Sequence, residues 1–277
     1  MRGRGQYHRY FASIGVARKF KRGGLAVQGN FMGNPALSVI FRKENIPGAC
    51  PPVGGRAAVM FDVLRASSTI ITALANGARE IVLAATPEEA RDRASTLKIG
   101  SFVLGGERHG LKISGFDLGN SPRDYSKDVV GGKTVVFTTT NGTEALRACA
   151  REGAASIWVG SLLNIDAIAG AVLAVGTDVV LVGAGTEGTQ GSDDACGAGA
   201  FIAAALKMKS CELDDSAVLA LNHFRTYSSM GEVLRQSQGG RNLVRIGLGA
   251  DIDDCDGSRA TYAIAPRFNP NSNSIVA

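Results

Sequence analysis

Clustered cysteines are missing from this sequence. Its five cysteines are spread over 277 residues, and no two of them form a Cys-x-x-Cys pair. Disulfide frameworks and thiolate zinc sites need closer spacing, so neither is indicated. Scattered, unpaired thiols are typical of a reducing compartment, and we expect a cytoplasmic protein.

Long apolar runs and aromatic side chains are scarce as well. No uninterrupted apolar stretch of the sequence approaches the ~18–20 residues that cross a bilayer, so we expect no membrane partner. Aromatic residues make up only 6% of the chain, whereas hydrophobic residues make up 45% and glycines number 36. That balance is typical of a compact α/β protein with tight loops rather than a fibrous or disordered one.

Acidic residues are missing from the first 22 positions, which contain seven Lys or Arg. The whole chain carries a formal charge of +5, yet residues 56–277 alone carry −3, so the basic character belongs to the N-terminal head. A mildly acidic body does not favour nucleic acid as a partner. The head itself is compatible with a targeting segment, a tail that contacts polyanions, or a start codon assigned too far upstream.

A turn-rich linker, PGACPPVGG (47–55), separates this head from the rest of the chain. Proline and glycine at this density interrupt regular secondary structure. We therefore predict a poorly ordered head and linker over residues 1–55 and a folded domain over residues 56–277.

Short apolar runs alternate with amphipathic stretches through the body, and they predict strands and helices respectively. Buried β-branched runs that alternate with helices indicate a mainly parallel or mixed sheet covered on both faces, which is an α/β fold. Beyond residue 209 the pattern predicts polar helices and an irregular tail. The predicted strands span 57–61, 80–85, 101–106, 133–139, 155–160 and 178–185, and the predicted helices span 67–77, 142–152, 163–174 and 193–208, with one more that begins at Pro87.

The carboxyl ends of the predicted strands carry the chemically informative residues, and this is the edge where such sheets bind ligands. Asp62 ends the first of them, and Arg65, Ser67, Ser68 and Thr69 follow in the turn and the first helical residues. A helix N-terminus favours phosphate or another oxyanion, and an arginine could add a two-pronged contact. The alternative is structural, with Ser67 or Ser68 as the N-cap and Asp62 as a capping acid.

The segment GGERHGLKISGFDLGNSP (105–122) is predicted to be a long polar loop. Loops of this length in compact domains are often functional. Glu107 and Asp117 supply two carboxylates that could hold a hard cation such as Mg²⁺, which takes oxygen ligands and commonly keeps waters for a phosphate substrate. A solvated Ω-loop is the alternative interpretation. The other polar residues of the loop are Arg108, His109, Lys112, Asn120 and Ser121.

Two further turns join a strand end to a helix. In TTTNGTEAL (138–146), the residues Thr140, Asn141, Gly142 and Thr143 are expected to face the same crevice as Asp62.

The second turn, GAGTEG (183–188), matches the dinucleotide-binding pattern G-x-G-x-x-G. However, the next helix is predicted to begin only near Ser192, and no second strand ends in an acid about twenty residues on. We interpret Glu187, Asp193 and Asp194 as acids at the edge of the site or at helix caps.

Taken together, these segments closely resemble one family, the 2-phosphosulfolactate phosphatases of the coenzyme M pathway. They lie between residue 57 and about residue 200, and several are long enough to be highly specific. The closing segment GGRNLVRIGLGADIDDC (239–255) is less similar, because Gly239 stands where the family is expected to have a histidine. The similar stretches are FDVLRASSTIITALANGA, LGGERHGLKISGFDLGNSPRDY, GKTVVFTTTNGTEAL, GSLLN and AGTEG.

The resemblance implies a Mg²⁺-dependent phosphomonoester hydrolase that acts on a small, doubly anionic carboxylate such as 2-phosphosulfolactate. It also implies a three-layer α/β/α architecture, allows two similar halves, and is compatible with a homodimer. Phosphoryl transfer needs neutralised phosphate oxygens, an in-line nucleophile and a protonated leaving group. The expected catalytic residues and metal ligands are Asp62, Glu107 and Asp117. Asp62 would be the nucleophile or a ligand, and Glu107 or Asp117 would take the other role or donate the proton. The expected substrate-binding residues are Arg65, Ser67, Ser68, Thr69, Arg108, Asn120, Ser121, Thr140, Asn141, Gly142, Thr143 and Glu187.

Three rival functions can be weighed against this one. A haloacid-dehalogenase-type phosphatase also uses a strand-end aspartate, but it needs a second acid two residues on, where this chain has Leu64. A non-catalytic phosphometabolite-binding protein could keep Arg65 and the TTTNGT turn, but it would not need Glu107 and Asp117 together. A dinucleotide-dependent oxidoreductase rests on GAGTEG alone. The presence of both acids favours catalysis.

Overall fold

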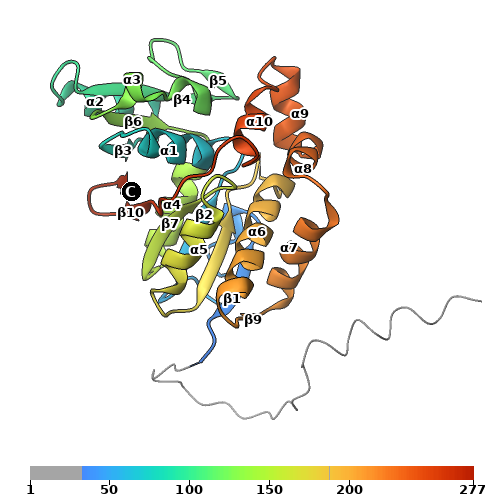
Figure 1. Cartoon of the computed structure of the whole chain (residues 1–277). Helices are drawn as coiled ribbons and strands as arrows, with labels where there is room; N and C mark the ends of the chain where they lie inside the picture. The colour runs from blue at the N-terminus through green and yellow to red at the C-terminus, as the bar shows by residue number, and fades with distance from the viewer. Residues whose placement is uncertain (1–32, 187) are drawn as a thin grey trace, which may run out of the picture. The chain divides into compact units, whose positions relative to one another are not determined.

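The structure is a computed structural model that describes residues 33–186 and 188–277. The basic head predicted at residues 1–22, and Glu187 among the predicted site residues, lie outside the described residues. Residues 34–277 form one compact unit. Figure 1 shows its helices and strands along the chain.

The strands and helices of this unit alternate through most of the chain. The strands are β1 (Ala36–Ile40), β2 (Ala57–Phe61), β3 (Glu80–Leu83), β4 (Phe102–Arg108), β5 (Leu111–Lys112), β6 (Thr134–Thr138), β7 (Ser156–Gly160), β8 (Val179–Gly183), β9 (Glu212–Leu213), β10 (Arg267–Asn269) and β11 (Ser274–Val276). The helices are η2 (Lys43–Asn45), α1 (Ala66–Ala75), α2 (Pro87–Ser95), η3 (Pro122–Asp124), α3 (Lys127–Val130), α4 (Gly142–Arg151), α5 (Ile165–Leu173), α6 (Ser192–Met208), α7 (Asp215–Thr226), α8 (Met230–Gln236), α9 (Gln238–Arg245) and α10 (Asp251–Cys255).

Among the described residues, the strands form one sheet in the order β5-β4-β6-β3-β11-β10-β7-β2-β8-β1-β9. Strands β4, β6 and β3 run parallel and form an upper block in Figure 1. Strands β7, β2, β8, β1 and β9 are also mutually parallel and form a lower block. The hairpin β10–β11 from the end of the chain joins the blocks through antiparallel pairings. Because three antiparallel pairings separate them, the strands of the two blocks run in opposite directions.

The predicted α/β class is confirmed, and the predicted elements of the body agree with the observed ones to within about two residues at their ends. The sheet begins earlier than predicted, however. Strand β1 lies in the segment assigned to the head and linker, and Leu37 pairs with Val179 of β8. Its short apolar run, between Pro35 and a charged triplet, gives no periodic signal. The folded unit therefore starts at residue 34 rather than 56.

The loop predicted over residues 105–122 is also partly regular. Strand β4 continues to Arg108, the chain turns at His109 and Gly110, and β5 returns antiparallel to β4. The turn needs the left-handed region, with φ of 53° at His109 and 79° at Gly110, and glycine adopts this region without strain. Glu107 is therefore held on a strand rather than in a long loop.

Alternate residues of β2 pack against helices on opposite faces of the sheet, as expected for a strand buried on both sides. Ala58 and Met60 join the core formed with α1 and α4, while Val59 and Phe61 join the core formed with α5, α6 and α7. The predicted three-layer arrangement is thereby confirmed (Figure 1). No helix in the described ranges is long and apolar enough to span a bilayer.

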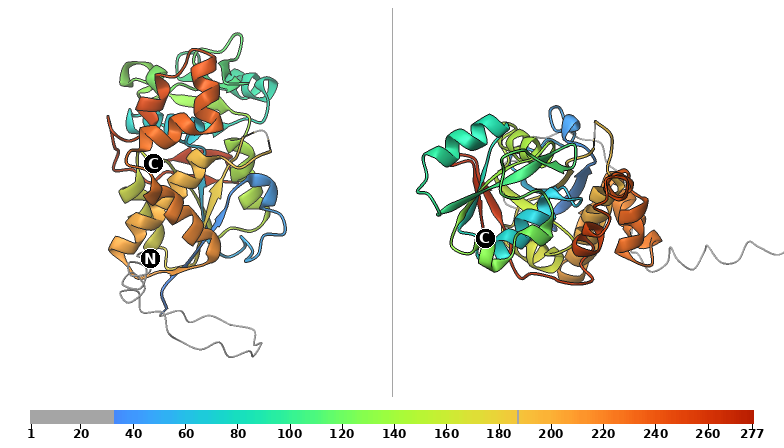
Figure 2. Two further views of the ribbon diagram at one scale, coloured as in Figure 1. Left: turned by 90° about the vertical axis from the view of Figure 1, so that its right-hand side faces the viewer. Right: turned by 90° about the horizontal axis from the view of Figure 1, so that it is seen from above.

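Helices α1 and α4 form a layer that both blocks share. Side chains of β2, β7 and β8 from the lower block and of β3 and β6 from the upper block pack into the same core with them. Helix α1 leaves the carboxyl end of β2, and α4 leaves the carboxyl end of β6. The C-terminal helices α8–α10, orange to red in Figure 2, stack next to α6 and beside the upper block.

Candidate active site

Asp62 lies where the N-terminal ends of α1 and α4 meet. Its Oδ1 accepts a hydrogen bond from the Ala66 amide at 3.2 Å, at the first residue of α1. A Cβ atom on Gly142, the first residue of α4, would lie 2.9 Å from Asp62 Oδ2. Any side chain at Gly142 would therefore press on the carboxylate. This contact agrees with the expectation that the two turns face one crevice.

Acidic side chains from the end of β4 and the start of α6 lie close to Asp62. The pKa of Asp62 is raised to about 7, first by burial and then by the charges of Glu107 and Asp193, while the Ala66 amide and the Lys43 ammonium oppose the rise. Burial likewise raises the pKa of Asp193 to about 6. A carboxyl group with a pKa in this range exchanges its proton near neutral pH, as catalytic acids and metal ligands often do.

The neighbours Asp193 and Asp194, at the start of α6, have different roles. Asp194 accepts hydrogen bonds from the amides of Val63 at 2.9 Å and Gly185 at 3.0 Å, so it ties the turn after β2 to the loop after β8. Its pKa is raised well above the usual range by burial and by the charges of Asp193 and Asp62. Asp193 Oδ1, in contrast, is buried without a hydrogen-bond partner. Both oxygens of Asp194 are therefore engaged, whereas Asp193 also receives backbone hydrogen bonds but keeps Oδ1 without a partner.

Two glycines, Gly191 and Gly239, lie close to the carboxylate of Asp193. A Cβ atom on Gly191 would lie 3.0 Å from its Oδ1, and one on Gly239 would lie 3.3 Å from its Oδ2. Gly239 is the position where the resembled family is expected to carry a histidine. A larger side chain there would contact Asp193 directly, so this difference falls inside the acidic cluster.

Glu107 connects the end of β4 to the turn before α4. Its Oε1 accepts hydrogen bonds at 2.9 Å from both the amide and the hydroxyl of Thr140, and its Oε2 accepts one at 2.8 Å from the Gly110 amide. The side chain is only 7% exposed. Glu107 thus holds two predicted site segments together, and both of its oxygens are engaged in doing so.

The hydroxyls that follow Asp62 point into the protein rather than into the crevice. Ser67 donates to the Asp62 carbonyl at 2.9 Å, and Ser68 donates to the Val63 carbonyl at 2.8 Å. Thr69 donates to the Asn120 carbonyl at 3.0 Å, and all three hydroxyl residues are buried. Their expected role in substrate binding is therefore replaced by the structural alternative, in which they fix the turn that carries Asp62.

The two predicted anion-binding arginines are also engaged by the protein. Arg65 forms an ion pair with Asp251 at 2.6 Å, donates to the Gly110 carbonyl at 2.6 Å, and is only 3% exposed. Arg108 donates to the carbonyls of Glu107 and Ala85 and to the Thr138 hydroxyl. Both guanidinium groups therefore have partners within the protein, whereas the sequence predicted an anionic substrate as their partner.

The remaining loop residues are dispersed. Asp117 is exposed and accepts a hydrogen bond from the Leu104 amide of β4 at 2.8 Å, so it lies against the edge of that strand instead of joining Asp62 and Glu107. Ser121 donates to Asp251 at 2.8 Å, and Asn120 is buried with its Oδ1 unpartnered. Among the residues that the structure describes, no group of three or more His, Cys, Asp and Glu side chains is arranged to hold a metal ion.

Lys43 is a candidate site residue that the sequence did not reveal. It lies on η2 directly after β1, and its Nζ donates to Asn141 Oδ1 at 2.9 Å at the start of α4. Glu44 pairs with the same ammonium at 2.9 Å. Because the segment was assigned to the basic head, its lysine carried no signal, and only the pairing of β1 with β8 brings it to the crevice.

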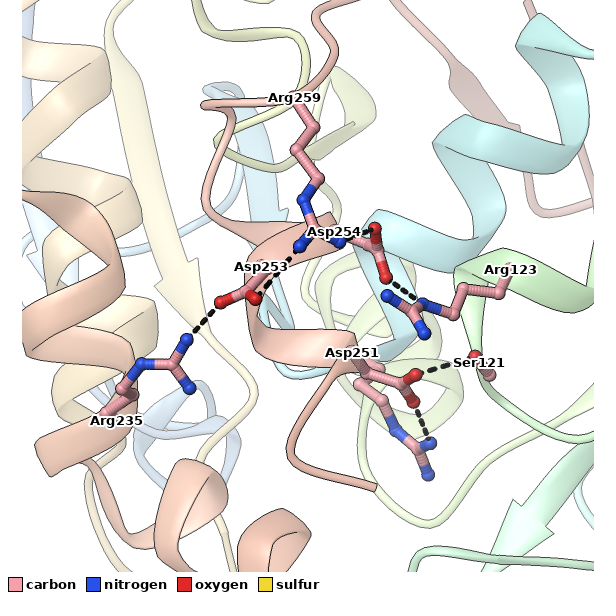
Figure 3. Close-up of polar contacts among 8 residues, drawn as sticks. Ser121, Arg123, Arg235, Asp251, Asp253, Asp254 and Arg259 are labelled. Atoms are coloured by element: carbon pink, nitrogen blue, oxygen red, sulfur yellow. Dashed lines mark hydrogen bonds and ion pairs between the residues drawn. The ribbon is translucent and has the colours of Figure 1, made fainter. Parts of the chain in front are cut away.

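Helix α10 carries a network of charges (Figure 3). Asp253 pairs with Arg235 of α8 and with Arg259, while Asp254 pairs with Arg123 of η3 and with Arg259. Asp251, on the same helix, accepts a hydrogen bond from Ser121 and forms a buried ion pair with Arg65. The sequence analysis assigned no role to this segment.

A pocket of about 690 Å³ opens elsewhere, on the outer side of α5 and α6. Ile165, Ala200, Phe224 and Met230 are among its mostly apolar lining residues. None of the predicted site residues lines it. The polar and charged side chains described above lie instead where α1 and α4 begin.

Comparisons with known proteins agree with the resemblance seen in the sequence. A family model described as 2-phosphosulpholactate phosphatase matches residues 41–269, a range that contains both blocks and the acids around Asp62. A protein of Clostridium acetobutylicum, named probable 2-phosphosulfolactate phosphatase, is 40% identical over 204 residues, which are 73% of this chain and 86% of that protein.

Two further relatives bear the same name. The protein of Symbiobacterium thermophilum is 40% identical over 226 residues, or 81% of this chain and 95% of its own length. The protein of Deinococcus radiodurans is 42% identical over 197 residues, or 71% of this chain and 81% of its own length. The similarity thus spans most of each chain.

Proposed function

The chain belongs to the 2-phosphosulpholactate phosphatase family, and on this premise we propose that it hydrolyses a phosphate monoester of a small anionic hydroxy acid. The family and the names of the relatives indicate a phosphoric monoester hydrolase. The first substrate to test is 2-phosphosulfolactate, which would give 3-sulfolactate and phosphate. The observation that carries the proposal is Asp62, a carboxylate with a pKa raised to about 7 at the meeting point of two helix N-termini.

The start of α4 is the place where we expect the phosphate group to bind. A helix N-terminus carries free amides and a partial positive charge, which favour a phosphate. Lys43 adds a positive charge there, because its ammonium, which also pairs with Glu44, lies 2.9 Å from Asn141 Oδ1. Lys43 thereby takes the part that the sequence analysis gave to Arg65.

Mg²⁺ is the cofactor we propose, held by Asp62 and Asp193. The buried, unpartnered Oδ1 of Asp193 supports this fit, since a desolvated carboxylate oxygen without a partner is costly unless a cation or proton satisfies it. Mg²⁺ commonly binds through one or two carboxylates and keeps waters and substrate oxygens as its other ligands. When bound, it would neutralise charge on the phosphate oxygens. Asp117 is not needed as a ligand, and Glu107 already uses both oxygens.

The chain's own residues then divide the work. Asp62 is the acid on which turnover depends, either as nucleophile or as ligand of the cation. Ser67, Ser68 and Asp194 keep its turn rigid. Glu107 holds Thr140, and with it the open turn at the start of α4, at the rim of the crevice.

Phosphate release from a panel of phosphorylated hydroxy acids, including 2-phosphosulfolactate, tests the proposal. Turnover is expected for at least one of them, should stop in EDTA and should return with added Mg²⁺. Full turnover in a chelated, metal-free sample would keep the phosphatase and reject the cofactor. Calorimetric binding of these esters without any release would instead indicate a non-catalytic phosphometabolite-binding protein.

A further inference from the structure

We propose that Asp251 is a positioning residue for this site: acting through Arg65 and Gly110, it holds Glu107 in place beside Asp62. The role rests on the proposed hydrolase function. Nothing in the sequence singles Asp251 out, because 186 residues separate it from Arg65.

The first link is a buried ion pair. Arg65 and Asp251 approach to 2.6 Å, and their side chains are only 3% and 4% exposed. The second carboxylate oxygen of Asp251 accepts a hydrogen bond from Ser121 at 2.8 Å, which fixes the rotation of the carboxylate. With both oxygens engaged, Asp251 can hold the guanidinium of Arg65 in one orientation.

The second link passes through a single glycine. The other terminal nitrogen of Arg65 donates a hydrogen bond to the Gly110 carbonyl at 2.6 Å, and the Gly110 amide donates one to Glu107 Oε2 at 2.8 Å. The turn at Gly110 needs a φ of 79°, so the chain can present its carbonyl to Arg65 and its amide to Glu107 only in this conformation. Arg65 is the N-cap of α1, three residues after Asp62. The path therefore joins the β2–α1 turn to the end of β4.

The path begins on helix α10, which further ion pairs on its more exposed side connect to neighbouring segments. Arg123, Arg235 and Arg259 bind Asp253 and Asp254 on the more exposed side of the helix (Figure 3). These pairs connect α10 to η3 and α8, whereas Asp251 is directed inward to Ser121 and Arg65. Exposed pairs contribute little stability individually, but a buried pair that loses one partner leaves an uncompensated charge. The two sides of α10 can therefore be tested separately.

The test compares Asp251→Asn with Asp254→Asn in the full-length chain. The control removes an ion-pairing carboxylate from the same helix without touching the path to Glu107. For Asp251→Asn we expect kcat to fall about 100-fold, the size of effect that a displacement of about 1 Å can have, with KM changed less than about threefold. Asp254→Asn should keep kcat within about threefold of the wild type. Equal losses of kcat in both variants would overturn the proposal, because they would make the effect a general loosening of α10.

A readout at Gly110 separates positioning from general stability and does not depend on activity. The backbone amide of Gly110 should shift in the ¹H–¹⁵N spectrum and exchange faster with solvent in Asp251→Asn, and it should stay unchanged in Asp254→Asn. An unchanged Gly110 amide in Asp251→Asn would overturn the proposal. If the wild type releases no phosphate from any ester, the proposed function fails, and the Gly110 measurement still decides the role of Asp251.

The double variant Arg65→Met/Asp251→Leu covers the case in which Asp251→Asn does not fold. Apolar residues of similar size often replace a buried ion pair without loss of stability. We expect the melting temperature to recover while kcat stays low, because the contact with the Gly110 carbonyl is gone. Recovery of kcat together with stability would show that Asp251 only neutralises a buried charge. A raised KM with unchanged kcat would instead mark Arg65 as a substrate contact, and would likewise overturn the proposal.

Discussion

The turn after β2 and the turn after β6 both lead from a strand end into a helix of the shared layer, yet they are built in opposite ways. In the first, Ser67 and Thr69 are buried and bonded to backbone carbonyls, so that Asp62 is the polar group left at the crevice. In the second, Thr139 and Thr143 are buried and contact each other, but Thr140 is exposed and Asn141 is partly exposed. Thr140 contacts Glu107, and Asn141 contacts Lys43. We call the turn after β2 the closed turn, because its buried hydroxyls fix Asp62 in place. We call the turn after β6 the open turn, because Thr140 and Asn141 remain accessible.

This difference teaches how hydroxyl-rich turns should be interpreted. Both turns have a composition typical of an anion-binding helix start, and only burial distinguishes them. A hydroxyl that already donates to a buried carbonyl cannot be withdrawn for a ligand without leaving that carbonyl unsatisfied. We therefore expect the open turn to contact the substrate and the closed turn to contribute to the stability of the fold.

The largest effect should come from Asp62→Asn. The substitution keeps the shape of the side chain and removes the charge, so turnover should fall by about 10²–10⁴-fold, the range for loss of an essential acid or base. The fold should be retained, which circular dichroism can verify. Turnover near the wild-type level in a folded Asp62→Asn protein would show that the closed turn does not carry the essential acid.

A matched pair of substitutions, Ser67→Ala and Thr140→Ala, sharpens the comparison. Ser67→Ala removes a buried hydrogen bond, so the free energy of unfolding should fall by about 1–3 kcal/mol. Thr140 is exposed, so Thr140→Ala should change the free energy of unfolding by less than ~0.5 kcal/mol. Turnover should nevertheless fall several-fold, because Glu107 loses its hydrogen bond from the Thr140 hydroxyl. Thermal unfolding and kcat measured on both variants decide the matter. Equal losses of stability would contradict the division into a closed and an open turn.

The pH dependence of stability tests the acidic cluster. The raised pKa values of Asp62, about 7, and Asp193, about 6, mean that the folded state keeps protons that the unfolded chain releases near pH 4. Stability of the metal-free protein is therefore highest at low pH within this window and falls as the pH rises from about 4 to about 7. Between pH 5 and pH 8 we expect a loss of at least ~1 kcal/mol, or roughly 2–4 °C in melting temperature.

Mg²⁺ should reverse this loss at pH 8, and Asp62→Asn should reduce it. Melting curves at constant ionic strength, with and without Mg²⁺, give the comparison. A metal-free melting temperature that rises steadily from pH 5 to pH 8 would contradict the raised pKa values.

A smaller effect is expected from Lys43→Gln. Loss of the ammonium beside Asn141 should raise KM about tenfold and weaken inhibition by inorganic phosphate, with kcat less affected. Lys133→Gln is the control, since Lys133 precedes β6 at the opposite end of that strand from the open turn. Equal KM values in the wild type and Lys43→Gln would remove Lys43 from the site.

The sequence predicted the strands and helices of the body well, because strands buried on both faces and separated by helices leave a clear pattern of apolar runs. It failed for β1, whose five residues become a strand only through pairing with β8 and β9. It also failed for β10 and β11, which form a hairpin inside the sheet where an irregular tail was predicted. Asp62, Glu107 and the turn at Asn141 were predicted as site residues because strand ends mark the ligand edge of such sheets, and the structure places them close together. Arg65 and the hydroxyls after it were misjudged, since burial depends on Asp251 and Asn120, which are distant in sequence.

The location of a bound phosphate tests the central claim most directly. The measurement is a crystal structure of the protein with Mg²⁺ and inorganic phosphate, the product of the proposed reaction. We expect the phosphate at the start of α4, close to Lys43 and Asp62, with the cation between Asp62 and Asp193. Phosphate bound only in the pocket lined by Phe224 and Met230, or anywhere away from Asp62, would contradict it.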